Sequence, residues 1–229
     1  MRHLPVAAAL ALMLAATGTA SAQPQPLLPP PPQPPRPAAA APAPPPRARG
    51  VQVMTLDSQA WPDGGALPLL HSQAGRDVSP ALSWSGAPEG VVSYAVVMRD
   101  LDALTFATGE DALHWLIWNI PGTSTGLPAG VPHGNAAPPP PRFGGGPPPP
   151  PTDGPRQISA TGPSYRGPAA PAAGPAHHYV FELFALDTWI DVPAVGQSPS
   201  ATRAAVTLAM AGHVRGKGVR MATFRRPAP

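Results

Sequence analysis

Three stretches of the chain have the two-residue hydrophobic period of β-strands, at residues 93–99, 113–120 and 177–186. In each stretch both alternating sets of positions are largely apolar, so we expect strands that are buried on both faces, as in the middle of a sheet. The expected faces are Tyr94, Val96 and Met98 in the first strand, His114, Leu116, Trp118 and Ile120 in the second, and His177, Tyr179, Phe181 and Leu183 in the third. Weaker strand patterns cover residues 52–56, 81–84 and 218–224.

One helix is predicted near the C-terminus. Ser198 fits the N-cap and Pro199 fits the first helical position. The expected apolar stripe consists of Ala201, Ala205, Leu208 and Gly212. Many strands followed by one late helix, without regular strand–helix alternation, predict a mainly β (α+β) fold rich in antiparallel pairs.

The 39 prolines among the 229 residues concentrate in two tracts and define the domain organisation. Residues 23–50 favour extended polyproline II and lack the apolar side chains of a core, so we interpret them as a disordered linker. Residues 135–155 are interpreted as an exposed proline-rich loop inserted in the domain, because closure cost grows slowly with loop length. One folded domain is therefore expected over residues 51–229.

The first 22 residues have the pattern of a signal peptide. Arg2 and His3 form a positive start, residues 6–16 an apolar run too short to span a bilayer, and residues 20–22 (Ala-Ser-Ala) a cleavage site. We therefore expect a periplasmic or secreted protein with no transmembrane segment after signal cleavage. The chain has no cysteine, which excludes disulfides, thiolate chemistry and a lipid anchor on cysteine.

The formal net charge of +3 comes from four arginines that precede Val51. From Val51 onward, 11 basic residues oppose 12 acidic ones, a net charge of −1. A domain that binds phosphate backbones needs a clustered basic face, so we expect no nucleic-acid partner.

Four polar residues of the predicted strands suit the chemistry of anion binding. Asp100 ends the first strand and His114 opens the second, so a hairpin would bring them together. His177 opens the third strand, with Tyr179 two places further on the same face. Each residue taken alone is more typical of a structural role. A metal site is disfavoured because the histidines lack short ligand spacings, and no cofactor is expected.

The order of several motifs resembles the phosphatidylethanolamine-binding protein (PEBP) family, in its bacterial Raf-kinase-inhibitor-like (YbhB/YbcL-type) branch. The resemblance runs from about Met54 to Arg226. It is carried by SPALSWSGAPEG at 79–90, DLDA at 100–103, HW at 114–115, NIP at 119–121, GPSYRGP at 162–168, HHYVF at 177–181 and the segment at 211–226.

The resemblance implies a large antiparallel sheet packed against a smaller sheet, a C-terminal helix and a pocket for small anions at one rim. The implied ligand-binding residues are Asp100, His114, His177 and Tyr179, with the loop 167–171 as one wall that ends at Pro171. The implied ligand is a small anion or a phospholipid headgroup with a phosphoryl or carboxylate group. The chain departs from the family at Leu101, where proline is usual, at Arg76-Asp77, and within 169–173.

Protonated imidazoles and the Tyr179 hydroxyl can donate hydrogen bonds to an anion, while Asp100 can orient a histidine and favour its charged form. We therefore expect a binding protein and not an enzyme. A hydrolase with His177 as base is disfavoured because no Gly-x-Ser-x-Gly nucleophile motif occurs. The other alternative is a protein-interaction or inhibitor module acting on an envelope enzyme.

Overall fold

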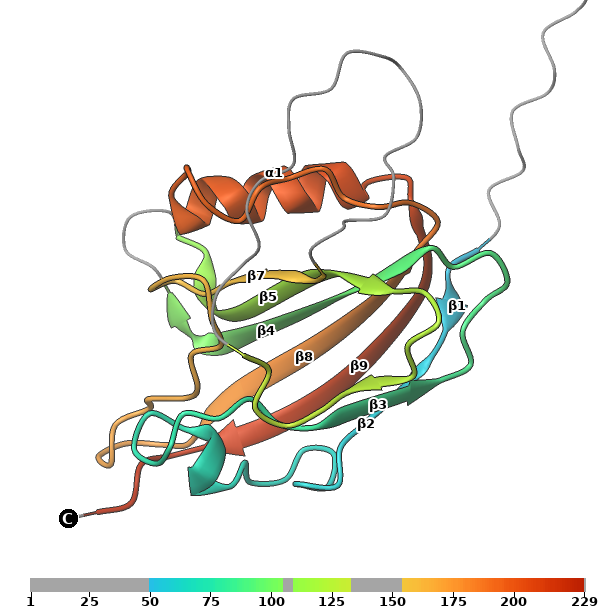
Figure 1. Ribbon diagram of the computed structural model, residues 1–229. Coiled ribbons are helices and arrows are strands. Elements are labelled where there is room, and N and C mark those ends of the chain that lie inside the picture. Colours follow the sequence, from blue (N-terminus) through green and yellow to red (C-terminus); the bar gives the residue numbers. More distant parts are fainter. Residues whose placement is uncertain (1–49, 105–108, 133–153, 229) are drawn as a thin grey trace, which may run out of the picture. The chain divides into compact units, whose positions relative to one another are not determined.

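The computed structural model describes residues 50–104, 109–132 and 154–228. The expected signal peptide, all of the expected linker except Gly50, and residues 135–153 of the expected insertion lie outside the described residues. The folded part is one compact unit whose elements run in the order of Figure 1.

The larger of two sheets has six strands in the order β1-β9-β8-β4-β5-β7. Their bounds are β1 Gln52–Val53, β4 Ser93–Leu104, β5 Asp111–Pro121, β7 Arg156–Ile158, β8 His177–Leu186 and β9 Val214–Phe224. All neighbours are antiparallel except β1 and β9. The three strands with the strongest sequence patterns are therefore adjacent at the centre, where both faces are buried, as predicted.

A smaller antiparallel sheet packs on one face of the larger sheet (Figure 1). It contains β2 Thr55–Asp57, β3 Leu82–Ser85 and β6 Gly126–Leu127. A short 3₁₀ helix, η1 Leu69–His71, lies in the connection between β2 and β3. Side chains of both sheets form the main core, including Leu56, Trp84, Tyr94, Met98, Trp115 and Phe181. This is the mainly β, two-sheet architecture that the resemblance implied.

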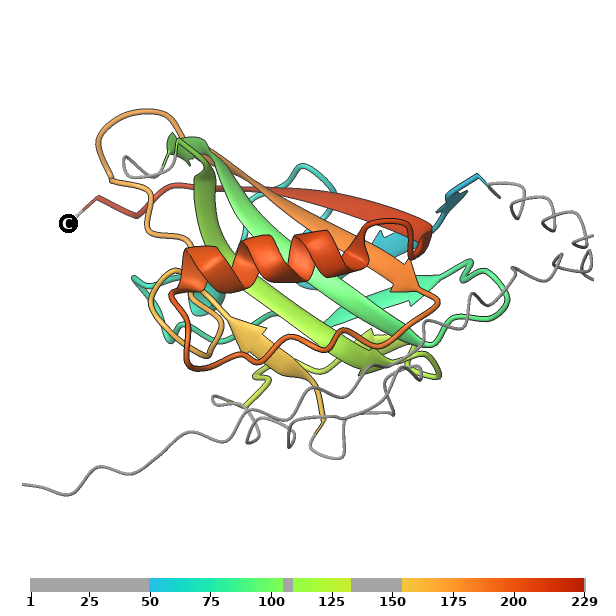
Figure 2. The same ribbon diagram turned by 90° about the horizontal axis from the view of Figure 1, so that it is seen from above.

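The single α-helix of the described residues, α1 Pro199–Met210, crosses the opposite face of the larger sheet (Figure 2). Ser198 caps it as predicted, because its hydroxyl accepts a hydrogen bond from the backbone N–H of Ala201. A second core forms beneath the helix, with Leu116 and Trp118 of β5 at its centre. Within the part of the chain that the structure describes, no helix has the length and apolar character needed to cross a membrane.

Several predicted strand limits were too narrow. Strand β4 continues beyond Asp100 to Leu104, and β5 already begins at Asp111. Asp100 and His114 are therefore inside strands and not at strand ends. The expected strand at 52–56 is two short strands that belong to different sheets, and β9 begins four residues earlier than expected.

The predicted apolar stripe of the helix was wrong. The buried residues of α1 are Thr202, Val206 and Met210, whereas Leu208 is 77% exposed. Both sets follow helical spacing in this alanine-rich sequence, so periodicity alone did not distinguish them. Packing against the large apolar residues of β5 selects the stripe that contains Val206 and Met210.

Two matched substitutions test this face assignment. Val206 is fully buried, so Val206→Ala removes apolar contacts and leaves a void, and we expect it to lower the free energy of unfolding by about 1.5–3 kcal/mol. Leu208→Ala should change it by less than about 0.5 kcal/mol. Urea unfolding monitored by tryptophan fluorescence measures both. Equal losses, or a larger loss for Leu208→Ala, would show that the helix packs through the other stripe.

Candidate functional site

A β-bulge in β5 places His114 on the face of the sheet that carries Asp100. Met98 of β4 pairs with Trp115, but the next residue, Arg99, pairs with Leu113, so His114 is an extra residue between the two pairs. The bulge puts Leu113 in the core beneath α1 and leaves His114 beside Tyr179. Unbroken alternation, as the sequence predicted, would have put His114 on the helix side with Leu116.

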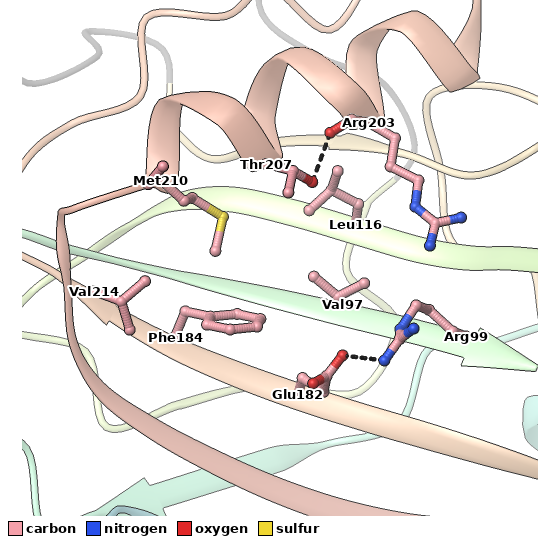
Figure 3. A pocket seen from close by; sticks show the side chains of 10 residues that line it. Val97, Arg99, Leu116, Glu182, Phe184, Arg203, Thr207, Met210 and Val214 are labelled. Atoms are coloured by element: carbon pink, nitrogen blue, oxygen red, sulfur yellow. Dashed lines mark hydrogen bonds and ion pairs between the residues drawn. The ribbon is translucent and has the colours of Figure 1, made fainter. Parts of the chain in front are cut away.

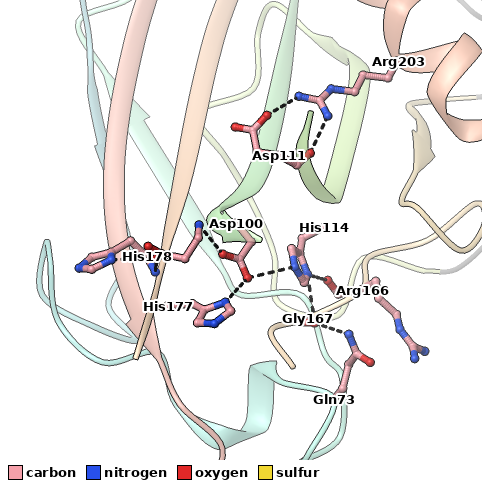
Figure 4. Close-up of polar contacts among 10 residues, drawn as sticks. Gln73, Asp100, Asp111, His114, Arg166, Gly167, His177, His178 and Arg203 are labelled. Atoms are coloured by element: carbon pink, nitrogen blue, oxygen red, sulfur yellow. Dashed lines mark hydrogen bonds and ion pairs between the residues drawn. The ribbon is translucent and has the colours of Figure 1, made fainter. Parts of the chain in front are cut away.

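The structure brings four of the predicted site residues together. Asp100 and Tyr179 are register partners across β4 and β8. The Nδ1 atom of His177 lies 2.8 Å from Oδ2 of Asp100, and Nε2 of His114 lies 4.0 Å from the same oxygen. The rings of His114 and Tyr179 meet edge to face at 5.2 Å. Figure 4 shows the Asp100 carboxylate between the two imidazoles.

Hydrogen bonds fix which nitrogen of each imidazole carries the proton. Nδ1 of His114 lies 2.7 Å from the carbonyl oxygen of Arg166 and 3.1 Å from that of Gly167. Nδ1 of His177 faces the carboxylate of Asp100. Carbonyl and carboxylate oxygens only accept, so both Nδ1 atoms must donate. In the neutral rings the lone pair is therefore on Nε2.

Burial shifts the pKa values of His114 and Tyr179 and so determines which of their protonation states is favoured. Removal from water lowers the pKa of His114 below its ordinary value, against the opposing influence of the Arg166 carbonyl and of Asp100. Burial, followed by the negative charge of Asp100, raises the pKa of Tyr179 well above its ordinary range. The Tyr179 hydroxyl is therefore protonated at physiological pH and available as a donor.

The Tyr179 hydroxyl is buried and has no hydrogen-bond partner of good geometry among the described residues. Asp100 and the backbone of Ala169 and Ala170 lie within hydrogen-bonding reach of the hydroxyl, although not in good geometry, and they influence its pKa. A buried donor left without a partner costs about 1–3 kcal/mol, so native structures rarely contain one unless it serves a ligand or a water molecule.

The predicted wall loop, residues 167–171, and the adjoining residues 165–166 are held by hydrogen bonds that each involve a main-chain atom. The backbone N–H of Gly167 donates to Oδ1 of Asp77 at 2.6 Å, and its carbonyl oxygen accepts from the Gln73 side chain at 2.7 Å. The Tyr165 hydroxyl donates to the carbonyl oxygen of His71. The same loop then presents the Arg166 and Gly167 carbonyl oxygens to His114.

The sequence reasoning missed the supporting roles of Gln73, Asp77 and Arg166. Asp77 has a positive φ of 55°, a conformation that Asp tolerates better than most residues, but only the structure reveals it. The predicted wall residue Pro171 is exposed at the surface, and it is Ala169 and Ala170 that lie near the Tyr179 hydroxyl.

The remaining histidines of the described residues make local contacts. His178, on the other face of β8, bonds through Nδ1 to Oδ2 of Asp102 at 2.9 Å, and its backbone N–H donates to the same carboxylate. These hydrogen bonds lower the pKa of Asp102. His71 is buried and bonds to the carbonyl oxygen of Val78, and His213 bonds to Asp187. Among the described residues, no group of three or more His, Asp or Glu side chains is arranged to hold a metal ion.

Comparison with known proteins defines the family. The model of the phosphatidylethanolamine-binding protein family matches residues 57–225, and the chain therefore belongs to that family. The UPF0098 protein of Methanothermobacter thermautotrophicus is 35% identical, over 76% of this chain and 99% of its own length. LppC of Mycobacterium tuberculosis, which is named as a candidate lipoprotein, is 29% identical over 77% of this chain and 75% of its own length.

A solved structure agrees with the fold. The crystal structure of Escherichia coli YbcL, described as a member of the mammalian PEBP family, covers 76% of this chain and 98% of its own length, with a TM-score of 0.55 and 23% identity. The UPF0098 protein YbhB of E. coli is 35% identical over 58% of this chain and 78% of its own length, so the expected membership in the bacterial branch of the PEBP family is confirmed.

A substitution at Gly167 tests whether the wall loop must lie close to the backbone of His71 and the side chain of Asp77. A Cβ atom at this position would overlap the backbone carbonyl of His71 and crowd Oδ1 of Asp77. We expect Gly167→Ala to lower the free energy of unfolding by about 1–3 kcal/mol, because the loop must move away from its backbone partners. Gly50→Ala, where the added atom meets open space, is the control. Similar urea midpoints for both variants would refute the close approach.

Proposed function

We propose that this PEBP-family domain is a binding protein for small anions that carry phosphoryl or carboxylate oxygens. The observation that carries the proposal is the buried Tyr179 hydroxyl, which has no good partner among the described residues, beside two imidazoles whose Nδ1 protons are already engaged. A free phosphate ester and a phospholipid headgroup share this chemistry. The site would bind either through the same oxygens.

Proton uptake is part of the proposed binding step. In their neutral forms both imidazoles offer a lone pair at Nε2, which repels an anionic oxygen. Protonation converts Nε2 into a charged donor, and a charge-assisted hydrogen bond contributes about 1.5–3 kcal/mol. The pKa of His114 is lowered by burial in the free protein. An anion beside the ring would raise this pKa, so binding draws a proton from solution.

Asp100 orients and charges the imidazoles in this proposal. Its side chain is only 4% exposed, and it accepts from His177 and from the backbone N–H of Asp102. A bare carboxylate would repel an anionic ligand. In this proposal the imidazole of His177, whose Nδ1 proton bonds to Asp100, lies between the carboxylate and the ligand. The negative charge of Asp100 also favours the protonated form of His114, which is the form that binds.

We propose binding without catalysis, because the sequence has no cysteine and no nucleophile elbow to pair with the histidines. We further propose that the protein is exported to the periplasm or secreted. The start of the chain has the pattern of a signal peptide. The name of the M. tuberculosis relative LppC supports an envelope location.

The pH dependence of affinity tests the proton-coupled step. Diethyl phosphate is a suitable probe because its single charge does not change near neutral pH. We expect its affinity, measured by calorimetry between pH 5 and 8.5, to increase as the pH falls through the range where the imidazoles become protonated. Repeating the titration in buffers with different ionisation enthalpies should reveal net proton uptake.

Two neighbouring histidines provide matched variants for this titration. His177→Ala should weaken binding about 10-fold or more at pH 6, since it removes a charge-assisted donor. His178→Ala should leave binding unchanged, although His178 is also paired with a carboxylate, because it lies on the other face of β8. Stronger binding at alkaline pH, or equal effects of the two variants, would contradict the proposal.

Tyr179→Phe separates a binding role of the hydroxyl from a structural one. The hydroxyl lacks a good partner among the described residues, so its removal should leave the free energy of unfolding within about 1 kcal/mol of the original. Affinity for diethyl phosphate should fall about 10-fold, because a donor to the anion is lost. Chemical unfolding and calorimetry measure the two quantities. Loss of stability with unchanged affinity would mean that the hydroxyl supports the fold and not the ligand.

A further inference from the structure

A groove of about 350 Å³ lies between α1 and the larger sheet (Figure 3). It is on the face opposite the Asp100 cluster, since the sheet residues that line it, such as Val97 and Leu116, alternate with those that face the smaller sheet. Its volume is at the lower end of the range for small-molecule sites and equals that of about a dozen water molecules.

One end of the groove is apolar. Phe184, Met210 and Val214 line it together with Val97 and Leu116. Several of these side chains are only half buried, because α1 crosses the sheet without covering β8 completely. Lys217 lies over the ring of Phe184, 5.1 Å from its centroid. The apolar end could therefore bury an alkyl or aromatic body.

The other end of the groove is closed by ion pairs that compensate one another. Arg99 pairs with Asp111 at 2.5 Å and with Glu182 at 2.6 Å. Each carboxylate also pairs with a second cation through its other oxygen: Asp111 with Arg203 at 3.1 Å and Glu182 with Lys217 at 2.7 Å. The three basic and two acidic groups together carry one excess positive charge. Glu110, 3.6 Å from Arg203, offsets this charge.

One donor at this end has no partner among the residues that the structure describes. The Nε–H group of Arg99 is buried and makes no hydrogen bond to the described residues. Arg99 lines the groove, and its guanidinium lies beside Glu182 where the apolar and polar ends meet (Figure 3). A buried N–H without an acceptor is costly, and a turn of the guanidinium that exposes Nε to the groove would let an oxygen acceptor from outside the chain satisfy it.

We propose that this groove is a second binding site, which takes a small uncharged amphiphile with an apolar body of about ten non-hydrogen atoms and a carbonyl acceptor, such as a medium-chain acyl amide. The body lies against Phe184 and Met210, and the carbonyl oxygen accepts from Nε–H of Arg99 once the guanidinium turns toward the groove. An ionic headgroup is disfavoured because each charge of the polar end already has an opposite partner, and a new ion would have to displace one.

Titration of the full-length protein with octanamide, followed by protein-observed NMR, tests the site. We expect saturable shifts at residues of α1 and β8, with a dissociation constant of roughly 0.1–5 mM for a ligand of this size. Thr207→Trp places an indole on the groove and should abolish binding, since Thr207 lines it. Leu208→Trp, one residue along the same helix and directed to solvent, is the matched control and should leave binding unchanged. Binding retained in Thr207→Trp, or an absence of saturable shifts in the unsubstituted protein, would overturn the proposal.

The headgroup is tested by comparing octanamide with octanoate and octylammonium. We expect octanamide to bind most tightly, and Arg99→Lys, which keeps the charge but lacks the Nε–H donor, to weaken octanamide about 2- to 10-fold. Equal or tighter binding of either ion would refute the uncharged headgroup. If Arg99→Lys does not fold, the comparison of headgroups on the unsubstituted protein decides. His177→Ala should leave octanamide binding intact, so this site and the proposed anion site can fail independently.

Discussion

One extra residue in β5 decides whether the site can exist. Because side chains alternate across a strand, the bulge at His114 moves this imidazole to the face that holds Asp100 and Tyr179. The same displacement leaves Leu113 in the core beneath α1. The hydrophobic contacts of Leu113 therefore stabilise the register that presents His114. The core of the domain, together with the neighbouring loop, therefore fixes the position of the imidazole.

The sequence predicted the central strands, the helix cap and the face shared by His177 and Tyr179, because each follows from a local period or a local hydrogen bond. It could not predict the bulge at His114, since strict alternation fits the same residues equally well. Nor could it choose between the two stripes of α1, because the choice depends on what lies opposite the helix. The contacts of Gln73 and Asp77 with Gly167 span about 90 residues, and no short-range pattern encodes such pairs.

Strand β4 serves both faces of the larger sheet through neighbouring residues. Asp100 meets His177 on the side of the smaller sheet, while Arg99 meets Asp111 and Glu182 on the side of α1. The two clusters share the backbone of β4 but lie on opposite faces of the sheet. The apolar packing on each face thus ends at a polar cluster, around Asp100 on one face and around Arg99 on the other. The two faces therefore present different chemistry to a ligand.

The support of His114 by main-chain oxygens has an evolutionary consequence. The carbonyl groups of Arg166 and Gly167 exist whatever side chains the neighbouring positions carry. Substitutions further along the loop, such as those at Ala169 and Ala170, can reshape the surroundings of the Tyr179 hydroxyl without changing the tautomer of the imidazole. Descendants of one ancestral chain could in this way acquire different selectivities while inheriting the same proton arrangement.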